Sequence, residues 1–432
     1  MLDVRLDPIT SPVNKSVTPP GSKSLTNRAL VLAALAQGRS TLSNVLFADD
    51  TQVMIDSLKQ LGFAIDVDVD SKTISVEGLE GQIPAESAEL FVGNSGTTIR
   101  FLAALCTLGV GRFSLDGIER MRERPIGQLI DLLKNLGARI SYSMNEGFPP
   151  IEIRANKLGG GFARFGASAS SQFLSAVLMV APNARHEVHI LLEPNQTSWP
   201  YVAMTMRLMD QFGVTPELER DPKTSEPTRI VIPRHSYIAT NYEIEPDASN
   251  ASYFVALAAI HPKSKIKIRG LTSHSLQGDA MFAEKMKQTG LRIERQADGL
   301  TIIGPEKLDG FDVDFTDIPD TAQTAAVIAL FASEPSTLRG LRTLRVKETD
   351  RIEALKNELT KLGAKVIVKD DTMTIAPPRS ISPAEIDTYN DHRMAMSFAI
   401  AATRAPGIVI RDAECVNKTY PEFFEDLKKL LS

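Results

Sequence analysis

The chain has 432 residues, a length that predicts two domains or a large repeat assembly rather than one ordinary core. Its composition is that of a globular protein, with 43% hydrophobic and 23% charged residues, and no apolar run is long enough to span a bilayer. The net charge of −5 argues against nucleic acid or an acidic membrane surface as the main partner. Any anion site must therefore be a local concentration of lysine and arginine.

The cysteines and histidines predict neither a disulfide framework nor a metal site. Cys106 and Cys415 have no metal-ligand spacing, and the six histidines are scattered along the chain. The first residues show no secretory signal pattern. We expect a cytoplasmic protein, and an organellar mature form is the alternative.

The stretch from Pro20 to Gly38 begins with polar residues and then becomes apolar almost all round. A helix that is apolar on every face must be buried, so its polar first turn must meet something that offsets the cost of burying charge. The same design recurs five more times, and the stretches stop at Gly38, Gly109, Pro182, Pro262, Pro335 and Pro406. The steps of 71, 73, 80, 73 and 71 residues indicate a sixfold internal repeat.

A second repeated element is an amphipathic helix that ends at a glycine. These glycines, at 62, 137, 213, 290 and 363, are 75, 76, 77 and 73 residues apart, and a short pair of strands follows each. The sixth such helix carries Phe423, Leu427 and Leu430 at the C-terminus, where the strand that should follow is missing. We expect residues 1–6 to supply it. Each repeat thus reads as strand, buried helix, strand, surface helix and hairpin, which predicts an α/β fold.

If the termini meet, three repeats fall in each of two domains. We predict one domain from residues 1–20 and 241–432 and an inserted domain from residues 21–240, joined by a two-stranded hinge near 20 and 240. Such a hinge suggests that the two domains close on a ligand. The alternative is a rigid solenoid without a hinge.

The polar residues that could bind a ligand collect at the starts of the predicted helices. Helix N-termini present free N–H groups and a positive dipole end, and they hold phosphates and carboxylates. The simpler alternative is that the serine, threonine, asparagine and aspartate residues at helix starts only cap the helices. We prefer this alternative for Ser43, Asp49 and Asp50. Capping does not explain lysine and arginine at a helix start, where the dipole disfavours cations. We therefore expect a strongly anionic ligand. Of the clustered arginines, we expect Arg122 to be solvated and Arg124 to lie at a helix start.

Asp320 and Glu348 are the carboxylates of interest, because each lies among cations or helix caps. Such a carboxylate can accept and return a proton if burial and neighbouring charge adjust its pKa. The alternative is a structural ion pair within residues 345–351, and the spacing alone favours neither.

Six motifs together resemble those of the EPSP synthase (3-phosphoshikimate 1-carboxyvinyltransferase) family, in the family's order and over nearly the whole chain. They are Gly21-Ser-Lys-Ser-Leu-Thr-Asn-Arg28, Gly93-Asn-Ser-Gly-Thr97, Arg120-Met-Arg-Glu-Arg-Pro-Ile126, Ser170-Ser-Gln172, Arg345-Val-Lys-Glu-Thr-Asp-Arg351 and Asn390-Asp-His-Arg-Met-Ala395. The resemblance implies a two-domain inside-out α/β barrel with three βαβαββ-type repeats per domain. It implies enolpyruvyl transfer from phosphoenolpyruvate to the 5-hydroxyl of shikimate 3-phosphate by addition and elimination, as a step in aromatic amino acid biosynthesis. It also implies a monomer without metal or organic cofactor, inhibited by glyphosate.

The resemblance also implies residue roles. The shikimate 3-phosphate ligands would be Lys23, Ser24, Arg28, Ser170, Ser171, Gln172, Ser198, Tyr201, Asp320, Thr343 and Lys347. The phosphoenolpyruvate ligands would be Lys23, Asn94, Gly96, Arg124, Gln172, Arg351, Arg393 and Lys418. Asp320 and Glu348 would transfer protons, with Lys23 as a third catalytic residue. We favour Asp320 as base toward the 5-hydroxyl and Glu348 as donor to the methylene carbon, although the sequence leaves this division open.

Three positions depart from the family's usual residues. Thr343 stands where asparagine is common, Phe101 stands where proline is common, and Trp199 stands where a smaller or basic residue is common. The first departure bears on a shikimate contact and the second on the response to glyphosate.

Two rival functions are weaker. UDP-N-acetylglucosamine enolpyruvyl transferases share the repeat, but they place a reactive cysteine before the arginine–proline pair, and residues 118–124 contain none. A binding or regulatory protein that kept only the anion pocket is the other rival, and the presence of Lys23, Asp320 and Glu348 argues against it.

Overall fold

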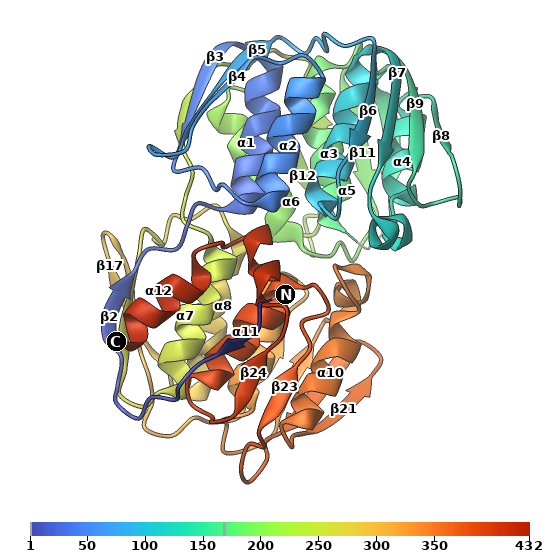
Figure 1. The fold of residues 1–432 in the computed structure, drawn as a ribbon. Coiled ribbons are helices and arrows are strands. Elements are labelled where there is room, and N and C mark those ends of the chain that lie inside the picture. Colours follow the sequence, from blue (N-terminus) through green and yellow to red (C-terminus); the bar gives the residue numbers. More distant parts are fainter. Residues whose placement is uncertain (1, 167–169) are drawn as a thin grey trace. The chain divides into compact units, whose positions relative to one another are not determined.

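In a computed structural model of the chain, residues 2–166 and 170–432 are described, and the chain divides into two compact units. Unit 1 comprises Met1–Pro20 and Glu245–Ser432, and unit 2 comprises Gly21–Ile244 (Figure 1). The second boundary lies a few residues beyond the predicted position, because β15 (Asn241–Glu243) pairs with β3 (Ala36–Ser43) inside unit 2.

The described residues form six sheets, three in each unit. In unit 2 the strand orders are β14 (Tyr237–Ile238), β3, β5 (Thr73–Leu79), β4 (Ile65–Asp68); β6 (Ser87–Phe91), β7 (Val110–Asp116), β9 (Ile151–Asn156), β8 (Ile140–Tyr142); and β10 (Gly161–Phe165), β11 (Val188–Leu192), β13 (Pro227–Ile232), β12 (Glu217–Arg220). In unit 1 they are β1 (Val4–Arg5), β24 (Ile408–Ile410), β23 (Ala384–Ile386); β17 (Arg292–Gln296), β18 (Gly299–Ile303), β16 (Lys265–Arg269), β2 (Asn14–Val17); and β19 (Asp312–Asp314), β20 (Ser336–Arg339), β22 (Thr372–Ala376), β21 (Lys365–Lys369).

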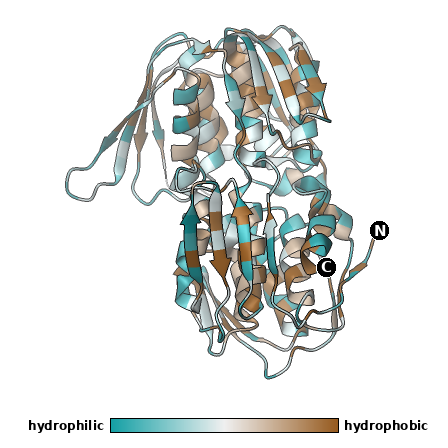
Figure 2. Ribbon diagram, turned by 90° about the vertical axis from the view of Figure 1, so that its left-hand side faces the viewer, coloured by the Kyte–Doolittle hydropathy of each residue, from teal (hydrophilic) through white to brown (hydrophobic). Residues whose placement is uncertain are grey.

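All six sheets share one pairing pattern. A parallel pair, such as β6 with β7, is followed by an antiparallel neighbour, here β9. Apolar and polar residues alternate along many of these strands, as the coloured bands of Figure 2 show, and such alternation is typical of strands with one buried face. In β5, for example, Ile74 and Val76 are buried while Glu77 is exposed. The predicted α/β fold and its repeat are therefore confirmed.

The predicted meeting of the chain termini is also confirmed. Strand β1 pairs antiparallel with β24, with Val4 opposite Ile410 and Arg5 opposite Val409. The start of the chain thus supplies the strand that the sixth repeat lacks. Met1, which the prediction included in this strand, lies outside the described residues.

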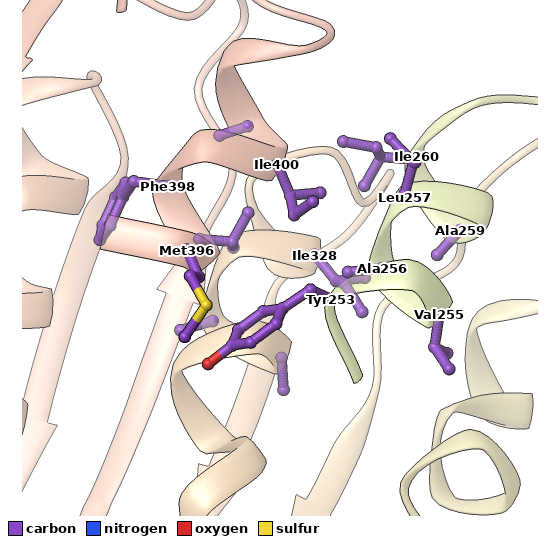
Figure 3. Close-up of a cluster of buried hydrophobic side chains, with 14 of the residues drawn as sticks. Tyr253, Val255, Ala256, Leu257, Ala259, Ile260, Ile328, Met396, Phe398 and Ile400 are labelled. Carbon is purple, nitrogen blue, oxygen red and sulfur yellow. The ribbon is translucent and has the colours of Figure 1, made fainter. Parts of the chain in front are cut away.

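The helices that are apolar all round form the inside of each unit. They are α1 (Lys23–Leu35), α3 (Gly96–Leu105) and α5 (Ser171–Val180) in unit 2, and α7 (Ala248–Ile260), α9 (Ala322–Ala329) and α11 (His392–Ala402) in unit 1. All 13 residues of α7 are buried. Figure 3 shows side chains of the unit 1 core, where Leu257, Ile328 and Ile400 come from α7, α9 and α11. The predicted burial of these helices is confirmed.

The amphipathic helices have their apolar face toward these cores. They are α2 (Asp49–Gln60), α4 (Gly127–Asn135), α6 (Trp199–Gln211), α8 (Phe282–Lys285), α10 (Arg351–Lys361) and α12 (Phe423–Leu431). The five predicted capping glycines have φ between +82° and +95°, a left-handed conformation that ends a helix with little strain for glycine.

The fourth amphipathic helix is shorter than the pattern predicts. Only α8 is α-helical, and the 3₁₀ turns η4 (Gly278–Met281) and η5 (Met286–Thr289) flank it. Its apolar stripe is short, and the Thr289 hydroxyl donates to the Met286 carbonyl, which competes with regular helix formation. The other 3₁₀ turns are η1 (Cys106–Leu108), η2 (Glu119–Glu123), η3 (Ala181–Asn183), η6 (Pro319–Thr321), η7 (Arg342–Val346) and η8 (Ala413–Lys418).

No helix in the described part of the chain is both long and apolar enough to cross a membrane.

Candidate active site

Unit 1 gathers three cations around one carboxylate at the helix starts. Asp320 lies in η6, directly before α9, and its Oδ1 is 3.2 Å from Lys347 Nζ and 3.3 Å from Arg351 Nη1. Its Oδ2 is 3.0 Å from Arg393 Nη2, at the start of α11. Residues that are 27, 31 and 73 positions away in the sequence thus meet at Asp320.

Arg351 is fixed by two further carboxylates. Its Nε is 2.7 Å from Asp391 Oδ2, and its Nη2 is 2.9 Å from Glu348 Oε2. Both Arg351 and Asp391 are buried, with side chains 1% and 0% exposed. A buried guanidinium is stable only when it is paired and hydrogen-bonded, and here the planar group is held from two sides.

These charges set the protonation states in unit 1. Burial alone would raise the pKa of Asp320, but Arg393, Lys347 and Arg351 hold it well below its usual value. Burial lowers the pKa of Lys347, although Asp320 acts in the opposite direction. Asp320 is therefore an ionised carboxylate that occupies the middle of a cationic cluster. An incoming anion would compete with it for the same three cations.

In unit 2 the start of α1 carries the first lysine of interest. Ser22 caps this helix, and its Oγ accepts a hydrogen bond from the Leu25 N–H. The Nζ of Lys23 is 3.0 Å from Asp50 Oδ2, and both side chains are largely buried. Asp50 therefore neutralises a cation that the helix dipole would otherwise disfavour.

Asp50 corrects the interpretation of this segment as helix caps only. Helix α2 begins at Asp49 with Ala48 in the cap position, and the Thr51 hydroxyl bonds to the Ala48 amide and carbonyl there. Ser43 is the last residue of β3. None of the three predicted capping residues is the N-cap, and Asp50 is instead the ion-pair partner of Lys23.

Arg28 lies five residues beyond Lys23 in α1 and is buried, with 1% of its surface exposed. It donates hydrogen bonds to Thr205 Oγ1 at 2.7 Å, to the Ser24 carbonyl at 2.9 Å and to Ser175 Oγ at 3.3 Å, and it lies over the Phe101 ring. Burial lowers its pKa to about 10. Arg28 thus links α1 to α3, α5 and α6, in addition to any ligand contact.

Two arginines crowd the start of α3. Arg124 Nη1 donates to the carbonyl and side-chain oxygens of Asn94 at 3.0 and 3.2 Å. Arg100 Nη1 donates to Gln172 Oε1 at 2.6 Å and to the Gly96 carbonyl at 3.2 Å. A Cβ on Gly96 would lie 2.5 Å from Arg124 Nη2 and 2.8 Å from Arg100 Nη1, so glycine is needed for this close approach.

The environment of the remaining predicted residues varies. Ser170 caps α5 and accepts from the Gln172 amide, while Ser198 caps α6 in a left-handed conformation with φ of 54°. Ser171, Ser198, Thr343 and Lys418 are buried, whereas Ser24, Ser170 and Tyr201 are half-buried. Arg122 donates to both carboxylate oxygens of Asp116, and its side chain is 41% exposed, so it is a partly exposed ion-pair residue rather than a fully solvated one.

The sequence interpretation did not single out two residues that the structure brings to these helix starts. Asp391 both caps α11 and holds Arg351, and Arg100 holds Gln172. Asp391 could have been recognised as an N-cap residue, but its bond to Arg351, 40 residues away, has no local signal. No group of three or more potential metal-ligating side chains is found among residues 2–166 and 170–432.

Neither cysteine is suited to nucleophilic chemistry. Cys106 is fully buried in η1, and burial raises its pKa well above the ordinary thiol value. Burial also raises the pKa of Cys415 to about 12. Both thiols are therefore protonated near neutral pH.

Comparison with known proteins gives a consistent result over the whole chain. The family model for EPSP synthase (3-phosphoshikimate 1-carboxyvinyltransferase) matches residues 8–427. A 3-phosphoshikimate 1-carboxyvinyltransferase from Nostoc sp. is 44% identical over 429 residues, covering 99% of both chains, and one from Shewanella baltica is 44% identical over 432 residues, covering 100% of both. The structure of EPSP synthase from Acinetobacter baumannii has the same fold, with a TM-score of 0.81 at 23% identity over 99% of this chain and 98% of that one. The chain therefore belongs to the EPSP synthase family.

Proposed function

We propose that this chain transfers the enolpyruvyl group of phosphoenolpyruvate to the 5-hydroxyl of shikimate 3-phosphate, releasing phosphate. Membership of the EPSP synthase family supports the reaction. The single observation that carries the residue assignment is the ionised Asp320 held among Lys347, Arg351 and Arg393. This arrangement combines a proton acceptor with a binding place for an acidic substrate.

Phosphoenolpyruvate carries a phosphate and a carboxylate. Such groups are bound well by arginine guanidinium groups and by the free backbone N–H groups at helix N-termini. We assign its binding to Lys23, Asn94, Gly96, Arg124, Gln172, Arg351, Arg393 and Lys418. We assign shikimate 3-phosphate to Lys23, Ser24, Arg28, Ser170, Ser171, Gln172, Ser198, Tyr201, Asp320, Thr343 and Lys347. The many donors at helix starts support both assignments.

The first chemical step is addition of the 5-hydroxyl to C2 of phosphoenolpyruvate. Asp320 accepts the hydroxyl proton as the C–O bond forms. In the absence of substrate its low pKa makes it a weak base. When substrate anions take over Lys347, Arg351 and Arg393, the pKa of Asp320 rises, and the carboxylate becomes a stronger proton acceptor at the moment it is needed.

The same step adds a proton to the methylene carbon, and the protonated carboxyl group of Glu348 is the donor in this assignment. Its Oε2 is 2.9 Å from Arg351, which keeps it beside the phosphoenolpyruvate ligands. The resulting intermediate is tetrahedral and carries both substrates. Fixed cations stabilise its charge. The Glu348 carboxylate then takes a proton from C3 while Asp320 returns the hydroxyl proton to the departing phosphate, which gives the enol ether product.

The reaction as proposed needs no metal or organic cofactor. We further propose a cytoplasmic monomer in which the chain connections near residues 20 and 245 act as a hinge. Glyphosate is expected to compete at the phosphoenolpyruvate ligands. Phe101 bears on that competition, because it follows Arg100, which donates to the phosphoenolpyruvate ligands Gly96 and Gln172.

The proposal is tested by phosphate release from the purified chain. Release should require phosphoenolpyruvate and shikimate 3-phosphate together, and each alone should give none. UDP-N-acetylglucosamine in place of shikimate 3-phosphate should give no release. Turnover with the nucleotide sugar, or binding of both substrates without turnover, would assign the chain to one of the rival functions instead.

A further inference from the structure

Unit 2 contains a small basic pocket at the opposite end of its helices from the residues discussed above. It has a volume of about 180 Å³ and lies between the turn after α4, the end of β9 and the loop that follows β9. The lining residues are Thr107, Gly137, Ala138, Arg139, Ile153, Arg154, Ala155, Asn156, Lys157, Gly159 and Arg185. Thr107 lies in η1, just beyond the C-terminal end of α3. Gly96 is the first residue of α3, and the chain rises about 1.5 Å per helical residue from there to Thr107. The pocket is therefore roughly 15–20 Å from Gly96.

The charge of this pocket is strongly one-sided. Arg139, Arg154, Lys157 and Arg185 line it, and no aspartate or glutamate among the described residues does so. The chain as a whole has more acidic than basic residues, 53 against 48, so four cations without an acid are not a consequence of composition. Like charges in one concavity repel one another, and a bound anion would remove that repulsion.

Two of the cations are held in place by neutral or shared partners. Arg185 Nη2 donates to the Asn156 carbonyl at 2.9 Å, which fixes its guanidinium without neutralising it. Arg154 is 3.3 Å from Glu152, but the same carboxylate oxygen also pairs with Arg112. The pocket therefore keeps most of its positive charge.

The simplest alternative is that these cations satisfy the carbonyls at the helix ends. The backbone already does so. The Leu136 carbonyl accepts from the Gly159 and Gly160 amides, and the Gly109 carbonyl accepts from the Lys157 amide. The Thr107 hydroxyl bonds to the Ala104 carbonyl. The basic side chains are thus not needed to end the helices.

We propose that this pocket binds a small phosphate-bearing anion. Arginine matches the oxygens of a phosphate group in pairs, and lysine adds a compact charge. The volume suits a ligand smaller than those of ordinary drug-sized pockets. The group could belong to inorganic phosphate or to a phosphate monoester of a small sugar, and these share the same recognition chemistry. The site is separate from the proposed active-site residues and does not depend on their function.

Hydrogen exchange of the full chain tests the proposal, because it locates the bound ion. Orthophosphate and glucose 6-phosphate are each titrated, and exchange is followed in peptides that cover 137–139 and 157–159. Either ligand should slow exchange in both peptides, and the tighter of the two identifies the source of the phosphate group. Raising the salt concentration should weaken the effect.

A charge-reversed variant provides the decisive comparison. Arg139→Glu with Arg185→Glu should lower the affinity at these peptides by about 10-fold or more, because four units of charge are changed beside the anion. Lys72→Glu with Lys223→Glu is the matched control, since both lysines are exposed in unit 2 and outside the pocket. Its affinity should equal that of the unmodified chain.

Arg139→Gln with Arg185→Gln repeats the test if the reversed variant does not fold, and it should lower the affinity in the same direction. Protection at helix-start peptides alone, with none at 137–139 and 157–159, would overturn the proposal. An equal loss of affinity in the control variant with Lys72→Glu and Lys223→Glu would also overturn the proposal, because the net charge of the chain and not the pocket would then explain the loss.

Discussion

At the scale of single residues, the main feature is the double role of Asp320. Without substrate it is the counterion of Lys347, Arg351 and Arg393, at 3.0 to 3.3 Å from each. In the proposed reaction it becomes a base when substrate anions replace it. A carboxylate that stabilises the cation cluster without substrate therefore opposes binding of phosphoenolpyruvate, although it later assists the reaction of that substrate as a base.

Replacing Asp320 with asparagine should separate binding from turnover. The side chain keeps its size but loses its charge, so kcat should fall by about 10²-fold or more, the scale of general-base assistance. The affinity for phosphoenolpyruvate should stay unchanged or rise, because the three cations lose an internal competitor. Single-turnover rates and equilibrium titration measure the two effects, and a large loss of affinity would contradict the role.

Glu348→Gln tests the proton donor in the same way. Glutamine can still accept the hydrogen bond of Arg351, so substrate binding should remain largely intact while kcat falls about 10²-fold or more. Equal losses in affinity and rate would indicate that Glu348 only holds Arg351.

Gly96→Ala tests the close packing at the start of α3. The added methyl would meet Arg124 Nη2 at 2.5 Å, and the flexible guanidinium should move aside rather than the backbone. The KM for phosphoenolpyruvate should then rise by roughly 10-fold, since even a 1 Å misplacement of a ligand can be costly. The unfolding free energy should change by less than about 1 kcal/mol, because alanine favours the helix. A destabilised protein with unchanged KM would contradict this explanation.

At the scale of elements, each buried helix combines a polar start with an apolar body. At the start of α11, one residue both caps its own helix and bonds to a neighbouring helix. Asp391 caps the helix by accepting from the Arg393 amide at 2.9 Å and also bonds to Arg351 of α10. The two helices thus depend on one buried carboxylate for their relative placement.

Asp391→Ala should therefore destabilise the fold more than loss of an ordinary cap. Removing it leaves the buried Arg351 with fewer partners, which is expected to cost about 3–5 kcal/mol of unfolding free energy. Asp350→Ala is the control, because Asp350 caps α10 with its side chain 41% exposed and should cost only about 1 kcal/mol. Urea unfolding measures both, and similar values would contradict the buried pairing.

The sequence predicts elements well where the signal is local. Apolar bodies, polar starts and the glycines at 62, 137, 213, 290 and 363 all come from periodicity and capping, which act within a few residues. Two interpretations failed because the deciding contact is distant. Asp50 resembled a cap but pairs with Lys23, and residues 241–243 were assigned to the other domain but pair with β3.

At the scale of the whole molecule, the carboxylate cluster couples the fold to pH. The folded-state pKa of Asp320 is well below its unfolded value near 3.8, so its contribution to stability is complete above about pH 4 and is lost as the pH falls through the folded-state pKa. The unmodified chain should therefore be more stable than Asp320→Asn near neutral pH, by an amount that shrinks below about pH 4. Urea midpoints across this range measure it, and a difference independent of pH would contradict the assigned pKa.

Incorporation of solvent deuterium into the product is the sharpest test of enolpyruvyl transfer by addition and elimination. Addition and elimination pass through a methyl group at C3 of the enolpyruvyl moiety, which gains one proton from a side chain in exchange with solvent and then loses one. In D₂O, mass spectrometry should therefore find deuterium in the vinyl methylene of a product that joins both substrates. A joined product without deuterium would contradict the addition–elimination mechanism, and the absence of any joined product would contradict the proposed function.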